Sequence, residues 1–259
     1  MLEKLVDGKR LDGRGIEDYR TISVETGVIE KANGSAKVTI GKTVVYAGVS
    51  VEIGKPFPDK PDQGLLIVNA ELLPLSSPYA EQGPPSEEAI ELARVTDRGV
   101  RESEMLDLSE MVLVEGDKVR SVFADVSIIN VDGNLFDAVS YAVVSALSSA
   151  KIEKLEIDEE NNVVGTGELV PLPISTIPIS ITQARIEDTV IVDPTTNEEE
   201  VMNARITLTS NGDGNFCAGQ KGFPSSFTPE QIIKASETAL AKSGEIRKII
   251  QEAIKNGKA

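Results

Sequence analysis

The amino-acid sequence predicts an α+β fold built from two halves. Stretches rich in β-branched residues, such as 36–52 and 177–192, precede apolar helical patterns in each half. An acidic and polar segment, residues 151–167, lies between the halves. Strands that precede helices in both halves indicate helices packed on mixed or antiparallel sheets. We expect one half over residues 1–155 and the other over residues 156–259.

The first half should open with four strands. Valine, isoleucine, threonine and tyrosine favour extended structure because their side chains pack well on a pleated sheet. Runs that contain these types cover residues 19–29, 36–40, 43–52 and 65–73. Gly41 and Lys42, between the second and third runs, indicate a hairpin turn.

Two helices are expected in the rest of the first half. Ser86 is a typical helix cap with acidic residues directly after it, and a buried stripe recurs at helical spacing at Ala89, Ala93, Thr96 and Val100. Strands over 111–115 and 119–130 and a turn at 132–134 should follow. The second helix, residues 135–150, has Asp137 as its only charge, so we expect it to be central and buried.

The second half should contain short strands and one long helix. The predicted strands cover residues 177–183, 189–192, 204–210 and 215–219, with a turn at 211–214. Thr228, Pro229 and Gln231 form the pattern of a capping box with proline at the first helical position. The helix should run to about Lys255, with an interruption near Ser243–Gly244.

Composition excludes several chemistries. The chain has 259 residues, a net charge of −16 and no histidine, which removes Ser-His-Asp and Cys-His catalysis and histidine-ligated zinc. Its one cysteine, Cys217, cannot form an internal disulfide and is expected to be buried and structural. Because the net charge repels nucleic acid, RNA binding would require a local basic patch.

Targeting features point to a cytoplasmic protein. The chain has no uninterrupted apolar run long enough to cross a membrane, so no transmembrane helix is expected. Its first residues lack the apolar run of a signal peptide.

The first candidate site is the arginine set Arg94, Arg98 and Arg101. Spacings of four and three residues place all three on one ridge of the predicted helix, where they could clamp phosphates. The alternative is a solvated face whose arginines pair with acidic neighbours, namely Glu91, Asp97, Glu102 and Glu104.

The second candidate is the basic N-terminal segment with Lys9, Arg10 and Arg14. It could bind RNA, a partner or the body of its own fold. Taken alone, such a segment is more typical of a solvated arm.

The third candidate is a set of carboxylates, Asp193 and the run from Glu198 to Glu200. Paired carboxylates could hold Mg²⁺ or act as acid and base. Their local pattern is more typical of an exposed turn.

Four segments together resemble the RNase PH family: residues 10–20, 94–103, 123–134 and 191–200. The resemblance covers about residues 9 to 240. It implies the family's fold, two βαβ-type halves of the ribosomal protein S5 domain 2 type. Active members of the family degrade RNA from its 3′ end with inorganic phosphate.

The sequence departs from the active members of the family at two places. Leu135 and Phe136 stand where these members have the hydroxyl and arginine of a phosphate cradle, and Asp137 nearby would repel phosphate. Glu199 falls near the first catalytic acid and Arg205 at the second, where arginine can neither donate a proton nor bind a metal.

With these departures the chain resembles the inactive subunit of archaeal exosome rings. The resemblance implies no catalytic residue, metal or cofactor in this chain. Its implied partners are a catalytic RNase PH-like subunit in an alternating hetero-hexameric ring, RNA-binding cap subunits and single-stranded RNA. It also implies that the helix of Arg94 and Arg98 faces RNA, with Arg101 a weaker candidate.

Two other functions remain possible at this point. An active phosphate-dependent 3′-to-5′ exoribonuclease would use Asp193 and Glu199 to hold a metal, and Arg94 or Arg98 to hold phosphate. A small-molecule kinase on a related fold is disfavoured, because the closest candidate for a nucleotide loop, Gly83 to Ser86, is rich in proline.

Overall fold

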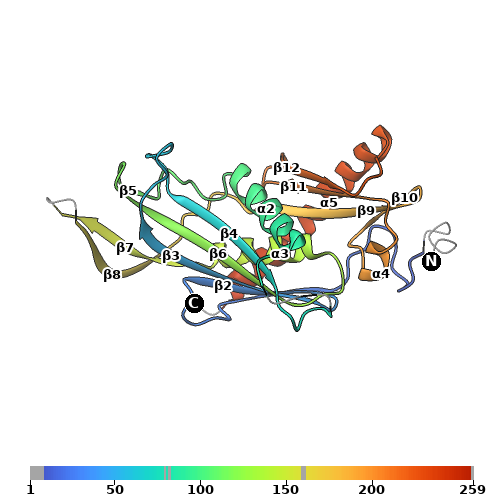
Figure 1. Ribbon diagram of the computed structural model, residues 1–259, viewed down its shortest axis with the longest axis horizontal. Coiled ribbons are helices and arrows are strands. Elements are labelled where there is room, and N and C mark those ends of the chain that lie inside the picture. The colour runs from blue at the N-terminus through green and yellow to red at the C-terminus, as the bar shows by residue number, and fades with distance from the viewer. Residues whose placement is uncertain (1–8, 79, 81–82, 159–161, 258–259) are drawn as a thin grey trace.

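The computed structural model describes residues 9–78, 80, 83–158 and 162–257. Two main sheets and three long helices make up the body, and a two-stranded hairpin projects from one end (Figure 1). The predicted α+β class is therefore confirmed. Every helix in the described residues is too short or too polar to span a lipid bilayer.

The first sheet is mixed. Its order is β1-β2-β3-β6-β4, with β5 paired to β6, and only the β4–β6 pair is parallel. The strands are β1 (Ile22–Thr26), β2 (Gly34–Ile40), β3 (Thr43–Gly54), β4 (Leu65–Leu72), β5 (Val112–Val114) and β6 (Lys118–Asn130). Ile40 pairs with Thr43 across a turn in which Gly41 has a φ of 59°, so the predicted hairpin is confirmed.

The second sheet is antiparallel, in the order β10-β9-β11-β12. Its strands are β9 (Ile179–Ile186), β10 (Thr189–Val192), β11 (Ala204–Ser210) and β12 (Phe216–Gly222). A one-turn helix, α4 (Thr196–Glu199), follows β10. The sequence analysis did not predict α4, because one helical turn is too short to show a periodic pattern.

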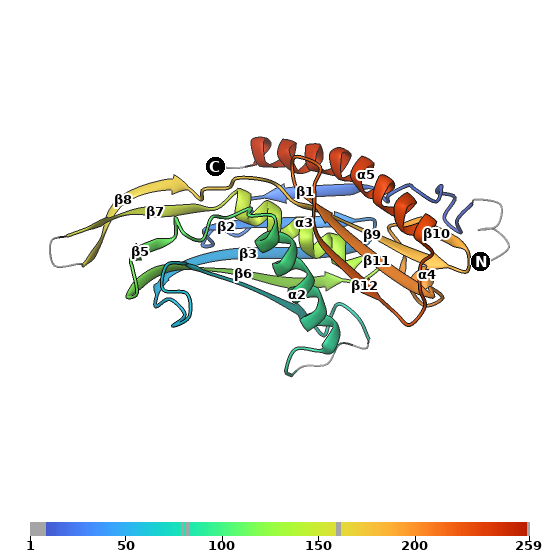
Figure 2. The same cartoon turned by 90° about the horizontal axis from the view of Figure 1, so that it is seen from above.

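Helix α3 (Leu135–Ser148) is the centre of the fold. Every residue from Leu135 to Leu147 is buried, as its sequence predicted. The helix contacts strands of both sheets, and α2 and α5 lie on opposite sides of it (Figure 2). Because α3 joins the two sheets in one core, the residues at its first turn are held by both.

The two outer helices begin where their caps predicted. In α2 (Glu87–Glu102), the Ser86 hydroxyl accepts the backbone N–H of Ala89 at 3.2 Å. In α5 (Pro229–Asn256), Thr228 and Gln231 form the predicted capping box.

The predicted interruption of α5 near Ser243–Gly244 is wrong. The Ser243 hydroxyl donates to the Leu240 carbonyl within the same helix, so it does not pull the backbone out of register. Ile246 and Ile250 beyond it are buried, so packing favours a continuous helix across Ser243 and Gly244.

The described part of residues 151–167, predicted as an acidic joint, belongs to a β-hairpin instead. Its strands are β7 (Lys151–Ile157) and β8 (Val163–Pro171), and it projects from the body (Figure 1). Most positions of both strands are exposed and the apolar residues do not alternate regularly, so the sequence of this segment is typical of a linker. The boundary between residues 155 and 156 falls inside β7, and the division into 1–155 and 156–259 stays a prediction.

Two glycine substitutions test this packing. A Cβ at Gly244 would meet no atom within 4 Å, so Gly244→Ala should raise the free energy of unfolding by about 1 kcal/mol, the usual gain for alanine in a helix. A Cβ at Gly34 would lie 2.6 Å from the Ala150 Cα, so Gly34→Ala should lower it by roughly 1–3 kcal/mol. Urea unfolding of each variant measures both effects. A stability loss in Gly244→Ala would contradict the continuous helix.

Candidate functional site

The N-terminal arm docks on the body of its own fold. Arg10 is only 2% exposed, and its guanidinium donates to both carboxylate oxygens of Glu198 at 2.8 and 2.5 Å. It also donates to the carbonyls of Val192 and Asp193, each at 2.7 Å. Of the three roles considered for this segment, binding to its own fold is confirmed, and the solvated-arm reading is wrong for Arg10.

Asp193 is the centre of an ionic cluster. Its Oδ2 accepts from Arg14 at 2.8 Å and from the Arg20 Nε at 2.9 Å, and its Oδ1 accepts from Arg20 at 2.7 Å and from the Asn134 side chain at 2.8 Å. Burial opposes ionisation, but the hydrogen bonds and charge of Arg20 outweigh it and hold the pKa of Asp193 below its usual value.

The interpretation that these carboxylates lie on an exposed turn is therefore wrong for Asp193 and Glu198, because both are buried. A metal role is also disfavoured, because arginines and an amide already occupy both oxygens of Asp193. Within the part of the chain that the structure describes, no group of three or more acidic or cysteine side chains could hold a metal ion.

The N-terminus of α3 is occupied by carboxylates of the chain itself. The backbone N–H of Asn134 donates to Glu199 at 2.8 Å, and its side chain donates to Asp137 and Asp193 at 2.8 Å each. A helix N-terminus attracts anions because its backbone N–H groups are free and its dipole is positive there. At the start of α3, carboxylates of the chain itself already accept these hydrogen bonds.

Burial raises the pKa of two of these carboxylates. The pKa of Asp137 rises to about 6, although hydrogen bonds from Tyr19, Asn134 and Thr182 act in the opposite direction. The pKa of Glu199 rises to about 7, against the lowering effects of the Asn134 N–H and the Arg205 charge.

Arg205 closes the space beside the first turn of α3. Its guanidinium carbon lies 3.8 Å from the centre of the Phe136 ring and 5.6 Å from that of Phe223, both within the range of a cation–π contact. It also forms a 2.6 Å ion pair with Glu91 of α2 and is only 7% exposed. Arg205 of β11 and Phe136 of α3, which the sequence analysis named as departures from active family members, therefore lie in contact.

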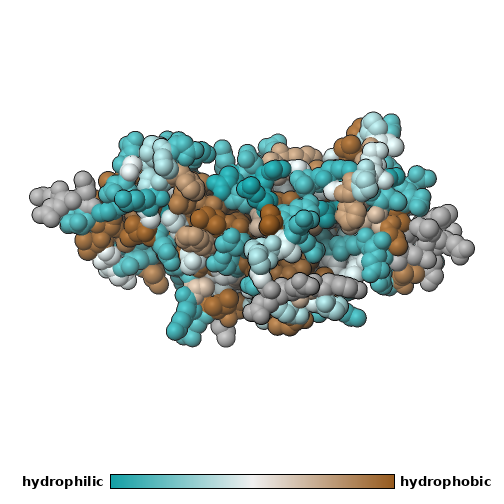
Figure 3. Space-filling view, viewed as in Figure 1, coloured by the Kyte–Doolittle hydropathy of each residue, from teal (hydrophilic) through white to brown (hydrophobic). Residues whose placement is uncertain are grey.

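The arginines of α2 divide into two groups. Arg94 and Arg98 are exposed, and neither has an ion-pair partner among the described residues. Arg101 pairs with Asp97 at 2.7 Å and donates to the Leu66 carbonyl at 2.9 Å. The surface over α2 is largely hydrophilic (Figure 3). The solvated-pair alternative therefore holds for Arg101, and RNA binding by Arg94 and Arg98 stays a prediction.

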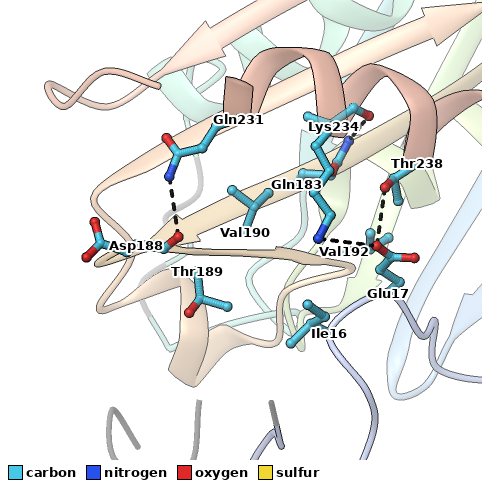
Figure 4. A pocket seen from close by; sticks show the side chains of 11 residues that line it. Ile16, Glu17, Gln183, Asp188, Thr189, Val190, Val192, Gln231, Lys234 and Thr238 are labelled. Atoms are coloured by element: carbon cyan, nitrogen blue, oxygen red, sulfur yellow. Dashed lines mark hydrogen bonds and ion pairs between the residues drawn. The ribbon is translucent and has the colours of Figure 1, made fainter. Parts of the chain in front are cut away.

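A separate cavity of about 260 Å³ lies between β10, α5 and the N-terminal arm (Figure 4). Its polar side chains contact neighbouring groups of the chain. Glu17 lies 3.5 Å from Thr238 and 4.0 Å from Lys234, and Gln231 donates to the Asp188 carbonyl at 3.3 Å. The cavity is thus a seam between the arm and α5, away from the arginines of α2.

Cys217 is half-buried, less than the sequence analysis expected. Its sulfur lies 3.4 Å from the Thr209 carbonyl, and burial raises the pKa of its thiol. A raised pKa disfavours the thiolate that a nucleophile needs, which agrees with a structural role.

Comparison with known proteins gives consistent matches over nearly the whole chain. Residues 18–153 match the model of domain 1 of the 3′ exoribonuclease family (RNase PH), and residues 176–242 match that of domain 2. The chain is 49% identical over 255 residues to the exosome complex component Rrp42 of Thermococcus gammatolerans, covering 98% of this chain and 93% of the relative. It is 50% identical over 256 residues to the Rrp42 component of Pyrococcus horikoshii, with the same coverage.

Solved structures show the same likeness. An Archaeoglobus fulgidus exosome with RNA bound to the active site contains a chain with a TM-score of 0.88 and 40% identity, covering 95% of this chain and 94% of that one. A chain of an archaeal exosome core has a TM-score of 0.85 and 38% identity, covering 96% and 94%.

The raised pKa of Glu199 predicts a pH dependence. A carboxylate whose folded pKa is about 7 instead of about 4.5 contributes stability that is complete below pH 4.5 and is lost as the pH rises through 7. Glu199→Gln mimics the neutral form at every pH. We expect it to match the parent near pH 4.5 and to exceed it at pH 8, by a free energy of unfolding on the order of 2 kcal/mol.

Urea unfolding of the isolated chain at both pH values measures this difference. Glu252→Gln, on an exposed part of α5, controls for the loss of one negative charge. An equal gap between Glu199→Gln and the parent at both pH values would show that folding does not raise the pKa of Glu199.

Proposed function

Because the chain belongs to the 3′ exoribonuclease family of RNase PH proteins, we propose that it is a non-catalytic subunit of an archaeal-type RNA exosome. In this role it structures the active site of a catalytic RNase PH-like subunit and contributes to RNA binding during 3′-to-5′ degradation. Support comes from the Rrp42 relatives, which match over nearly their full length, and from the archaeal exosome chains, which share its fold.

The observation that carries the non-catalytic role is the stack of Arg205 on Phe136. Phosphorolysis requires a site for orthophosphate and an acid that transfers a proton. The first turn of α3 presents a buried phenylalanine with a guanidinium over it, and its Asn134 N–H already binds Glu199. An arginine cannot transfer a proton near neutral pH, so Arg205 supplies no acid at its position, and Phe136 and Glu199 fill the space in which orthophosphate would bind.

The alternative, an active exoribonuclease with a metal on Asp193 and Glu199, fits the geometry less well. Asp193 is saturated by Arg14, Arg20 and Asn134. Moving it away from these partners would take the buried counter-charge from Arg14 and Arg20 and leave them only the more exposed Asp12 and Asp132, at a cost in stability.

The proposed partners follow from the same relatives. The chain would alternate with a catalytic RNase PH-like subunit in a hetero-hexameric ring that carries RNA-binding cap subunits and acts on single-stranded RNA in the cytoplasm. Arg94 and Arg98 would bind RNA phosphates without reading bases. Arg101 would contribute less, because Asp97 and the Leu66 carbonyl already occupy its guanidinium.

The purified chain alone should lack phosphate-dependent RNase activity. We expect no release of nucleoside diphosphates from single-stranded RNA in inorganic phosphate, and activity when the chain is assembled with a catalytic RNase PH-like subunit. Thin-layer chromatography of the products and the mass of the complex measure both. Robust release by the lone chain, abolished in Glu199→Gln, would establish the active alternative instead.

Reversing the charge of the two exposed arginines should weaken RNA binding. In the assembled complex, Arg94→Glu with Arg98→Glu should reduce RNA affinity about tenfold or more, because two charged phosphate contacts become repulsive. The complex should keep its mass. Fluorescence anisotropy with labelled RNA measures the affinity.

The matched control for this variant is Lys248→Glu with Lys255→Glu, which reverses two exposed charges on α5. It should leave RNA affinity within about twofold of the parent. Equal losses in both variants would indicate a general charge effect and would contradict the role of Arg94 and Arg98.

A further inference from the structure

A cleft of about 450 Å³ lies beside the arginine face of α2. One wall is α2, with Arg94 and Arg101, and the other is the connection between β3 and β4, with Phe57, Lys60 and Gln63. Arg98 does not line it. The cleft therefore brings Arg94 and Arg101 together, whereas the family resemblance singled out Arg94 and Arg98.

The cleft is built from fixed elements. Arg101 donates to the Leu66 carbonyl of β4 at 2.9 Å and pairs with Asp97, which braces the helix against the strand. In the connection, the Lys60 N–H donates to the Phe57 carbonyl at 3.0 Å, so these two residues form one turn.

Phe57 is the unusual member of this turn. It is 56% exposed, although a phenylalanine on a polar turn gains nothing from contact with water. A flat apolar ring in a cleft is a surface on which a nucleobase can stack, and such stacking tolerates any base.

The charges of the cleft favour a phosphate beside that ring. Its acidic residues are Asp97, which Arg101 already neutralises, and Asp59. Arg94 and Lys60 are both exposed, and neither has an ion-pair partner among the residues that the structure describes. Two available cations therefore face one acid, in a chain whose net charge is −16.

We infer that this cleft binds one nucleotide of single-stranded RNA, with the base stacked on Phe57 and the phosphate held by Arg94 and Lys60. The inference rests on the proposed function and deepens it by placing a base-stacking contact on the non-catalytic chain. The volume is within the range of small-molecule sites and suffices for a nucleotide.

The test uses the complex assembled with a catalytic RNase PH-like subunit. The probe is a fluorescent oligoadenylate in phosphate-free buffer, where phosphorolysis cannot consume it. Phe57→Ala should lower RNA affinity about 5- to 10-fold, the loss expected for one stacked base at an exposed site. Phe57→Tyr keeps the ring and should retain affinity within about twofold, whereas Phe57→Leu, which is apolar without a ring, should behave like Phe57→Ala.

Two further measurements separate the stacking from other effects. With an oligomer of abasic nucleotides, the parent and Phe57→Ala should bind equally, because no base remains to stack. Arg94→Gln should lower the slope of log affinity against log salt by about 0.7, the value for one phosphate contact on a single strand, whereas Lys248→Gln on α5 should not change it.

The outcomes distinguish this inference from the proposed function. If Phe57→Ala leaves RNA affinity unchanged, or weakens abasic and normal RNA alike, the stacking site is wrong while the exosome role stands. If Phe57→Ala prevents assembly of the complex, Phe57 is a subunit contact and the inference is overturned. If the unsubstituted chain forms no RNA-binding complex, the proposed function fails and the inference fails with it.

Discussion

The buried ion pairs around Asp193 are the constraint on which the rest of the structure depends. They join the N-terminal arm, through Arg14 and Arg20, to the end of β10 and, through Asn134, to the first turn of α3. Buried charges are tolerated only when each is paired and hydrogen-bonded, and removal of one partner leaves the other uncompensated. The cluster therefore permits one arrangement of these three segments and determines where α3 begins.

The position of α3 explains why the neighbouring space is closed. Asn134 has a left-handed backbone, with a φ of 54°, and three carboxylates accept its N–H groups. Phe136 in the same first turn faces Arg205 from β11, and the ring and the guanidinium form a cation–π contact at 3.8 Å. An incoming anion would have to compete with Glu199 for the helix N-terminus and with Glu91 for Arg205.

The sequence predicted most of the body because its patterns are local. The apolar composition of α3, the caps of α2 and α5 and the Gly41 turn are each read from consecutive residues, and all are confirmed. The ion pair of Arg10 with Glu198 spans 188 residues, so no local pattern could indicate it. Charge runs were accordingly read as solvated, which is their usual state, and this misassigned both partners.

The resemblance to a family located Phe136 and Arg205 as departures from an active site, but it could not show that they contact one another. That contact, and the ion pair of Arg205 with Glu91, required coordinates. The same holds for the hairpin of β7 and β8, because β8 is exposed at nearly every position and has no alternation of apolar and polar residues.

The contacts of Arg205 beside the first turn of α3 also affect how so acidic a chain can bind RNA. At physiological salt, charges beyond about 8 Å are largely screened, so the charges close to Arg94 and Arg98 decide more than the net charge of the chain. Glu91 lies one turn before Arg94 and is neutralised by Arg205, and Asp97 is neutralised by Arg101. Arg94 and Arg98 consequently keep their positive charge on the open side of the helix. Arg205, which stands where active members of the family have an acid, thus also neutralises Glu91 beside the surface proposed to bind RNA.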